Sequence, residues 1–489
     1  MPLILPGNVA TALGGEYEVA NSCRFNSVDS AYMHKTLGTA TSEKKFTFSA
    51  WVKRGLLTGN QTIFNVGPDG SDTWETGIRF RAQTDNDIHA TFDDGSQGSN
   101  RQLITRARYR DVASWIHIVF AVDTTQSTAA NRQKLFVNGV QMNDTDTYVN
   151  TYADQNEDCD AMDSGNTIAV GRRTSETTAY FDGYMAEVCF VDGTAYAASD
   201  FGEYDEDSPT IWKPKNVSGL TFGNNGFYLD FEDSSNLGND VNGGTDLTEV
   251  NLAATDQSTD TCTNNFCTGN NLDNYYAAST FSEGNLKIAT NAANKTFNTS
   301  TFVLTAGKWY FEVRASDTNS DDAAIGIASV VSPQSGANGG ELYDSAGNYA
   351  YRSNGNKANN DTSASYGDTW NDDNDIIGVA LDLDNLKIYF SKNGTFQDSG
   401  DPTSGATGTG AAYTITAPGS QTLTGSLQGY TPAFGEEGAQ SDVFELNFGN
   451  PTFSLSSGNA DGNGYGNFEY APPSGYLSLC SKNLGSDGG

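Results

Sequence analysis

Residues 375–394, DIIGVALDLDNLKIYFSKNG, hold the clearest structural signal in this chain of 489 residues. Apolar side chains occupy every second position in two short runs: Val379, Leu381 and Leu383, then Leu386, Ile388 and Phe390. This period places the apolar side chains of each run on one face of a β-strand. Asp384-Asn385 separates the runs and Asn393-Gly394 ends the second, and both dipeptides are typical of tight turns. The segment therefore predicts two adjacent antiparallel strands.

The second half of the chain resembles SPRY domains, which are β-sandwich recognition modules. Besides residues 375–394, the resemblance rests on segments that occur in the family's order: Lys308–Val313 directly after Gly307, Ala324–Ala328, Tyr351–Lys357, Tyr366-Gly367, Gly429–Phe434 and Phe444–Gly449. The resemblance implies a binding module rather than an enzyme core.

The first half carries a second hairpin of the same kind. Residues 115–123, which begin Trp115-Ile116-His117, are rich in strand-forming residues and predict one strand. Residues 134–140 predict the next strand, which ends in the turn dipeptide Asn138-Gly139. With three further strand signals in order, Phe46–Val52, Thr167–Gly171 and Phe181–Val188, this half resembles a laminin G or concanavalin A-like lectin sandwich. Such a fold hosts many unrelated activities, so the resemblance implies a fold more than a ligand.

Length and composition set the number of domains. A chain of 489 residues exceeds what one hydrophobic core usually supports, and no run shows sustained helical spacing. We therefore predict an all-β protein of two antiparallel β-sandwich (jelly-roll) domains in tandem. The predicted parts are an N-terminal anchoring arm (1–15), the laminin G-like sandwich (16–231), a polar connector (232–278), and the SPRY-like sandwich with its C-terminal tail (279–489).

The charge balance excludes some partners. Asp and Glu number 61 against 27 Lys and Arg, giving a formal net charge of −34, which repels nucleic acid and anionic membranes. The N-terminus lacks a basic segment and a long apolar stretch, so we expect synthesis in the cytoplasm without a signal peptide, and no membrane insertion. Six cysteines are too few for a disulfide scaffold, and Cys262 with Cys267 could close a small loop or remain two thiols.

The arrangement as a whole resembles virion structural proteins of marine tailed bacteriophages, of the tail fibre or head fibre type. The resemblance rests on Leu3–Asn8, Val19–Asn26, Thr263–Phe266 and a Gly-Tyr-x-x-Leu-Cys ending at 475–480. It implies a location on the virion, other virion proteins and further copies of this chain as partners, and attachment to a host cell-surface glycan or receptor. We expect the apolar segment Leu3–Pro6 to contact another subunit. The alternatives are a capsid decoration or structural component without a ligand, and a polysaccharide-degrading glycosidase.

Catalytic groups are scarce in the sequence. Glu203–Asp207 is the nearest approach to the alternating carboxylates of a glucanase strand, but it lacks apolar alternation and is expected to be a solvated loop. Only His34, His89 and His117 could act as bases, and His117 is expected to be structural. We therefore predict a protein that is not an enzyme.

Oxygen ligands could hold a metal ion in the first domain. Laminin G-like domains often bind one Ca²⁺ through loop carboxylates and carbonyls, and the resemblance implies such a site here. The loop aspartates that could converge on it are Asp93, Asp94, Asp144, Asp146 and Asp163. The alternative is a set of ordinary acidic turns.

Candidate ligand contacts combine loop aromatics with planar polar groups. In the first domain, they are Trp74, Tyr109 and the basic run of Arg106, Arg108 and Arg110, with cross-strand pairing to carboxylates as the alternative for the arginines. In the second domain, Tyr351, Arg352 and Trp370 lie near the binding loops of the SPRY family, and Tyr351 and Trp370 could instead belong to the core.

Overall fold

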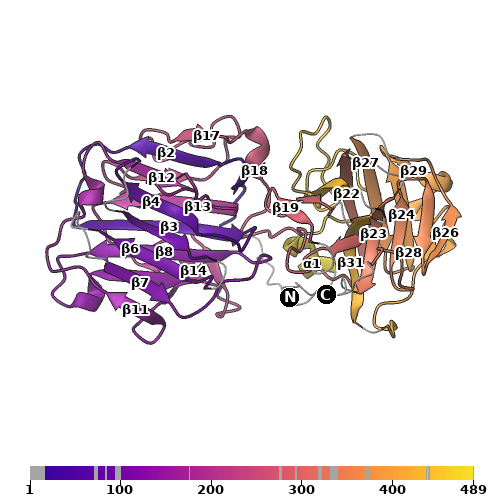
Figure 1. The fold of residues 1–489 in the computed structure, drawn as a ribbon, viewed down its shortest axis with the longest axis horizontal. Coiled ribbons are helices and arrows are strands. Elements are labelled where there is room, and N and C mark those ends of the chain that lie inside the picture. The colour runs from indigo at the N-terminus through magenta and orange to yellow at the C-terminus, as the bar shows by residue number, and fades with distance from the viewer. Residues whose placement is uncertain are drawn as a thin grey trace. The chain divides into compact units, whose positions relative to one another are not determined.

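The computed structural model (Figure 1) describes residues 17–70, 75–82, 85–93, 101–175, 177–274, 278–291, 295–317, 322–330, 340–370, 374–423, 425–436, 438 and 441–487. The described residues divide into two compact units, an N-terminal unit up to Thr263 and a C-terminal unit from Asn264 onwards. Strands make up 40% of the structure and helices 6%, and the sheets are antiparallel, so the prediction of an all-β fold of β-sandwiches is confirmed. No helix in the described ranges is both long and apolar enough to cross a membrane.

Two sheets form the sandwich of the N-terminal unit. The first runs β10 (Val140–Gln141), β9 (Gln133–Val137), β8 (Ile116–Asp123), β3 (Lys45–Arg54), β13 (Gly183–Asp192), β1 (Ser22–Phe25) and β18 (Gln257–Ser258), with β16 (Phe227–Leu229) also paired to β13. The second runs β11 (Thr147–Thr151), β7 (Arg101–Thr105), β6 (Ile88–Phe92), β5 (Thr76–Phe80), β4 (Gln61–Gly67), β12 (Thr167–Val170), β2 (Tyr32–Thr36) and β17 (Thr248–Val250). A hairpin of β14 (Gly202–Tyr204) and β15 (Trp212–Pro214) and the short helices η1 (Ala129–Asn131), η2 (Asp160–Met162), η3 (Ala198–Asp200) and η4 (Ala254–Asp256) complete it.

Aromatic side chains join the two sheets. The ring of Phe48 on β3 stacks on Phe64 of β4 with centroids 4.3 Å apart, and Phe64 also stacks on Phe190 of β13. The central strands are buried on both faces, because a second cluster that includes Phe201 and Phe222 covers the outer face of the first sheet. This covering explains why β13, and β3 from its second residue onwards, are buried throughout instead of alternating between buried and exposed residues.

The segment that the sequence assigned to a connector begins inside the N-terminal unit. After β16, β17 pairs with β2 and β18 pairs with β1, so residues up to Thr263 extend both sheets. The Asp260 carboxylate is fully buried; its Oδ2 lies 2.7 Å from Nζ of buried Lys53, and its Oδ1 accepts a hydrogen bond from Trp115 Nε1 at 3.0 Å. Residues 264–274 belong to the C-terminal unit, and the predicted arm (1–15) lies outside the described residues.

The C-terminal unit is a second two-sheet sandwich. One sheet runs β19 (Thr280–Ser282), β20 (Lys287–Ala289), β32 (Val443–Asn447), β22 (Lys308–Asp317), β27 (Asp375–Asp382), β28 (Lys387–Lys392) and β29 (Thr395–Phe396), with β30 (Tyr413–Thr414) also on β28. The other runs β21 (Thr296–Thr299), β31 (Ser426–Glu436), β23 (Ala323–Val330), β24 (Tyr349–Arg352), β25 (Asn356–Asn359) and β26 (Thr362–Ser365). The helical segments are η5 (Gln397–Ser399), η6 (Pro402–Thr407) and α1 (Ser481–Asp487).

The two predicted hairpin turns are present. Residues 375–394 form β27 and β28 as antiparallel neighbours, and Asn393-Gly394 turns into β29. Asn138-Gly139 joins β9 to β10 in the same way. In both turns the Asn has φ of 47°, and the Gly has φ of 77° at 139 and 79° at 394. Positive φ at both central positions is what a type I′ turn requires, so the sequence signal is confirmed.

The C-terminal tail lies on the C-terminal unit. Leu477 forms a parallel bridge with Trp309, and Phe266 forms an antiparallel bridge with Cys480. Glu312 on β22 anchors the preceding segment, since its carboxylate accepts hydrogen bonds from the backbone N–H groups of residues 469 and 470. These contacts attach the apolar tail to the C-terminal unit. All six cysteines are free thiols, Cys262 and Cys267 included.

Candidate functional site

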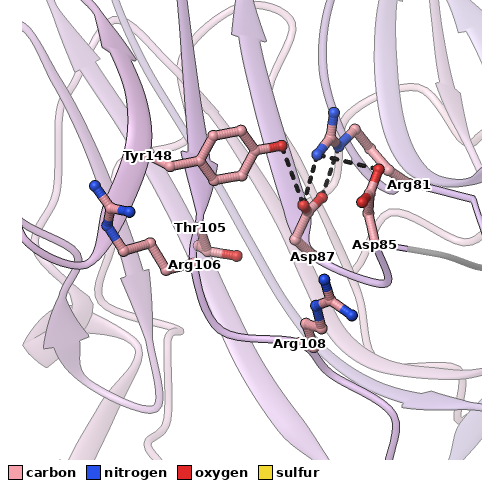
Figure 2. A pocket seen from close by; sticks show the side chains of 7 residues that line it. All are labelled: Arg81, Asp85, Asp87, Thr105, Arg106, Arg108 and Tyr148. Carbon is pink, nitrogen blue, oxygen red and sulfur yellow. Dashed lines mark hydrogen bonds and ion pairs between the residues drawn. The ribbon is translucent and has the colours of Figure 1, made fainter.

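A polar pocket of about 400 Å³ opens on the N-terminal unit (Figure 2). Seven residues line it: Arg81, Asp85, Asp87, Thr105, Arg106, Arg108 and Tyr148. They come from the end of β5, the start of β6, the end of β7 and the start of β11. In an antiparallel sheet of order β11-β7-β6-β5, these four strand ends share one edge, so the strand order itself assembles the pocket.

Backbone hydrogen bonds tie the three loops of the pocket together. Tyr109 N–H donates to Asn86 O at 2.7 Å, and Arg106 N–H donates to Asp146 O at 2.7 Å. The buried Arg54 joins two of the loops, since its Nη1 donates to Asn86 Oδ1 at 2.9 Å and to Tyr109 O at 2.7 Å. Burial lowers the pKa of Arg54 to about 9, which leaves it charged at neutral pH. The loops are therefore fixed to one another and to the sheet.

Arg81 neutralises the carboxylates of the pocket. Its Nε and Nη2 donate to the two oxygens of Asp87 at 2.7 and 2.6 Å, and Nη2 lies 3.4 Å from Asp85 Oδ2. The Tyr148 hydroxyl donates to Asp87 Oδ2 at 3.3 Å, and the Arg81 guanidinium lies over the Tyr148 ring, 5.4 Å from its centroid (Figure 2). A two-pronged Arg–carboxylate pair of this kind is geometrically well defined.

Arg106 and Arg108 have no such partner. Both side chains are exposed, and within the described ranges neither guanidinium forms an ion pair or a hydrogen bond. In Figure 2, neither is joined by a dashed line to any other residue drawn. The structure therefore gives no support to the alternative that pairs these two arginines with carboxylates across strands.

The predicted contacts of the first domain are thus brought together in part. Arg106 and Arg108 line the pocket, while Tyr109 lies behind it and packs against the core, where burial raises its pKa to about 12. Trp74 lies outside the described residues. Sequence reasoning missed Arg81, Asp85, Asp87 and Tyr148. Only the basic run at 106–110 could have pointed to this edge, because the other residues reach it through long-range strand pairing.

The predicted contacts of the second domain need correction. Tyr351 and Trp370 are fully buried, and the Tyr351 hydroxyl donates to Asp368 O. Arg352 lies 3.6 Å from Asp322 Oδ1 and over the Tyr343 ring. Tyr351 and Trp370 therefore belong to the core of the C-terminal unit and are not loop contacts for a ligand.

The aspartates predicted to bind calcium are placed by the structure in part. Asp94 lies outside the described residues, and Asp144 accepts hydrogen bonds from Asn150 Nδ2 at 2.9 Å and Tyr152 OH at 2.8 Å. Asp93 N–H donates to Thr76 Oγ1 at 3.0 Å. The described residues contain one group of three carboxylates within 4.8 Å of one another, and it lies elsewhere, in the C-terminal unit: Glu341, Asp344 and Asp361. Lys295 forms an ion pair with Glu341, so this group is partly neutralised.

The ring nitrogens of His117 are both engaged. Trp212 Nε1 donates to His117 Nδ1 at 3.0 Å, and Nε2 lies 2.8 Å from Ser49 Oγ. Because an indole N–H can only donate, Nδ1 accepts and Nε2 carries the proton towards Ser49. Burial lowers the pKa of His117 to about 3. This neutral histidine has no free lone pair with which to activate Ser49, as expected for a structural residue.

The carboxyl group of Glu187 on β13 was not foreseen as unusual. It is buried, and burial raises its pKa to about 7. The hydroxyls of Tyr17 and Tyr228 both donate to its Oε2 at 2.9 Å, at a β-bulge where Glu187 has φ of 51°. The group thus holds the start of the described chain, at Tyr17, against β13 and β16. By contrast, Glu203 and Glu206 of the acidic run are exposed.

Both units are β-sandwich domains, and each contains a match to a known domain family. Residues 27–198 match the Concanavalin A-like lectin/glucanases superfamily, and residues 308–425 match the SPRY domain. The chain therefore contains a lectin-like domain and a SPRY domain, as the sequence predicted. Neither match bears on a bacteriophage or virion origin. No curated protein matches the chain.

Similar solved structures extend these matches at low identity. A candidate carbohydrate binding protein from Bacteroides ovatus ATCC 8483 is 15% identical over 49% of this chain and 63% of its own, with a TM-score of 0.31. Stonustoxin is 14% identical over 37% of this chain and 27% of its own, with a TM-score of 0.27. The SPRY domain of human HERC1 is 14% identical over 33% of this chain and 87% of its own, with a TM-score of 0.24. At these levels the similarities say nothing about a ligand.

Proposed function

We propose that the protein binds carbohydrate without transforming it, and that the pocket of the N-terminal unit holds part of a cell-surface glycan. The observation that carries this proposal is a preformed polar pocket in a lectin-like domain, with two guanidinium groups that the described chain leaves without partners. Planar donors beside an exposed aromatic ring suit the hydroxyl groups and apolar faces of sugars.

Open, exposed sites of this kind bind weakly. The pocket is lined by polar side chains at the surface, and it excludes little water, so a single site is expected to have modest affinity. Several copies acting together would bind a cell surface far more tightly. This requirement fits the proposal that the protein is a homo-oligomeric component of a bacteriophage virion, such as a tail or head fibre, which contacts other virion proteins. That part of the proposal is supported by the sequence resemblance alone.

Two alternatives remain distinct. A capsid decoration or structural component would need no pocket, and the SPRY domain could then serve contacts between subunits. A glycosidase would need two accessible carboxyl groups that flank a sugar. The carboxylates of Asp85 and Asp87 are both paired with Arg81, which supports a non-catalytic pocket.

A glycan array tests the proposal. The purified chain, presented as a multimer, should bind a subset of glycans, and Arg106→Ala with Arg108→Ala should abolish that binding while the melting curve stays unchanged. Arg110→Ala is the matched control, because Arg110 is exposed in the same loop but does not line the pocket. Binding of no glycan by the multimer would favour the structural alternative. Release of reducing sugar from envelope polysaccharide would favour the glycosidase.

A further inference from the structure

Almost all described arginines of this acidic chain form an ion pair or a hydrogen bond within the protein. Ion pairs engage Arg24, Arg81, Arg101, Arg172, Arg173, Arg314 and Arg352, and hydrogen bonds engage Arg54 and Arg132. Arg79 and Arg110 also have partners. Within the described ranges, this leaves only Arg106 and Arg108 without one, although carboxylates outnumber basic groups by 61 to 27. Both of these exceptions line the same pocket.

The charge balance inside the pocket is opposite in sign to that of the chain. Three guanidinium groups face two carboxylates, which leaves one net positive charge, whereas the chain as a whole carries −34. Both carboxylates are already paired with Arg81, and Tyr148 also donates to Asp87. The positive charge that remains available to a ligand is therefore that of Arg106 and Arg108.

We propose that this pocket selects glycans with an acidic group, a carboxylate or a sulfate ester, and that Arg106 and Arg108 bind that group. This inference rests on the proposed function and specifies its ligand class. The planar fork of a guanidinium matches two oxygens of a carboxylate or sulfate, and such charge-assisted hydrogen bonds are stronger than those to neutral hydroxyls. The Tyr148 ring, 43% exposed, offers an apolar surface for the attached sugar ring.

The fixed backbone of the pocket favours binding of one acidic group at a defined position over a nonspecific attraction of anions. Arg106 is fixed through its N–H to Asp146 O, and the backbone at Arg108 is held between Arg106 and Tyr109, which Arg54 and Asn86 anchor. The backbone positions that carry the two guanidinium groups are thus set before a ligand arrives, which reduces the ordering that binding requires. Beyond the pocket the negative chain repels extended polyanions, so an isolated acidic group on a glycan is the best match.

Matched glycan pairs test the ligand class. The full chain is immobilised as a multimer and titrated with a glucuronoxylan oligosaccharide and its carboxyl-reduced form, and with a sulfated galactan oligosaccharide and its desulfated form. We expect at least one acidic member to bind about tenfold or more tightly than its neutral counterpart. The pair that shows the difference tells carboxylate from sulfate. Binding should weaken as salt rises, since both arginines are exposed.

Variants separate this inference from the proposed function. Arg106→Ala and Arg108→Ala should each weaken acidic-glycan binding about tenfold or more. Arg106→Lys keeps the charge but loses the fork, so an intermediate loss is expected, and Arg110→Ala should bind as the parent does. Equal binding of acidic and neutral members that still depends on both arginines would overturn the acidic preference and leave carbohydrate binding intact. Binding of no glycan in either pair or on the wider array would overturn both.

Discussion

Replacing Asp260 by Ala should destabilise the N-terminal unit by about 3–5 kcal/mol. Lys53 and Asp260 are both buried, with Nζ and Oδ2 2.7 Å apart, and Trp115 Nε1 donates to the other oxygen. Removal of the carboxylate leaves an ammonium group in the interior without its counter-ion. About 1 kcal/mol of this total comes from the loss of the hydrogen bond that Trp115 donates to the carboxylate. The loss of stability is large because the Asp260 carboxylate is removed while the charged Lys53 side chain stays buried.

Thermal unfolding of the full chain measures this effect. For a unit of about 250 residues, 1 kcal/mol shifts the midpoint by roughly 2–4 °C, so a fall of roughly 6–20 °C is expected. Only the transition of the N-terminal unit should move, because Asp260 lies in that unit. Lys44→Ala is the control, since its ion pair with Asp158 is partly exposed to solvent and its loss should cost less than about 1 kcal/mol.

A double replacement refines the test. Lys53→Met with Asp260→Leu exchanges both charges for apolar side chains of similar shape, and should recover part of the loss. If Asp260→Ala left both transitions within about 1 kcal/mol of the parent, the account of the buried pair would be wrong. A shift confined to the C-terminal transition would contradict the placement of residues 232–263 in the N-terminal unit.

Two further changes act on the units separately. Gly139→Val and Gly394→Val should each destabilise its own unit by more than about 1 kcal/mol in chemical denaturation, because both glycines have positive φ and an added Cβ would lie 2.4 Å from Trp212 or 2.5 Å from Tyr470; equal shifts of a single transition by both would argue against separate units. Acidification from pH 7 to 5 should move the two midpoints in opposite directions. Burial lowers the pKa of His89 and of His117 to about 3, so below about pH 6.5 these histidines bind protons more readily in the unfolded state than in the folded one. The stability of the folded N-terminal unit therefore decreases as the pH falls from about 6.5. Glu187, whose pKa burial raises to about 7, offsets part of this decrease because it binds its proton more readily in the folded state. The pKa of Glu312 is raised by burial to about 7, so its stabilising contribution is complete below about pH 4.5 and is lost as pH rises through 7. Glu312→Gln should flatten the pH profile of the C-terminal unit, and a parallel fall of both midpoints on acidification would contradict this assignment.

Local signals were the part of the fold that the sequence could predict. The Asn-Gly turns at 138 and 393 depend on two adjacent residues that tolerate positive φ, and both turns are present. The alternation of residues 375–394 likewise depends only on neighbours in the chain. The basic residues at 106 and 108 were conspicuous in so acidic a sequence, and they line the pocket.

Contacts between distant segments could not be predicted in the same way. Residues 248–250 form a short, half-buried edge strand with little apolar alternation, so their pairing with β2 leaves no clear mark in the sequence. The convergence of Asp87 and Tyr148 follows from the order β11-β7-β6-β5, which is fixed by the whole sheet. Tyr and Trp side chains occur both in binding loops and in hydrophobic cores, so residue type alone does not predict where Tyr351 and Trp370 lie. Their burial depends on tertiary packing.

The bridge between Phe266 and Cys480 gives the C-terminal unit a defined response to mechanical tension. The two segments run antiparallel, and Ser481 N–H donates to Asn265 O at 2.8 Å, so the chain enters and leaves this part of the unit at the same end of the pair. A force that pulls these ends apart loads the contacts one at a time, as in the opening of a zipper. We expect the ladder between β22 and β27, which pairs eight residues of each strand, to bear load only after the tail has detached. We therefore expect the tail to detach at a lower force than the one that unfolds the sandwich. The detached tail would lengthen the chain under tension while the two sheets stay folded.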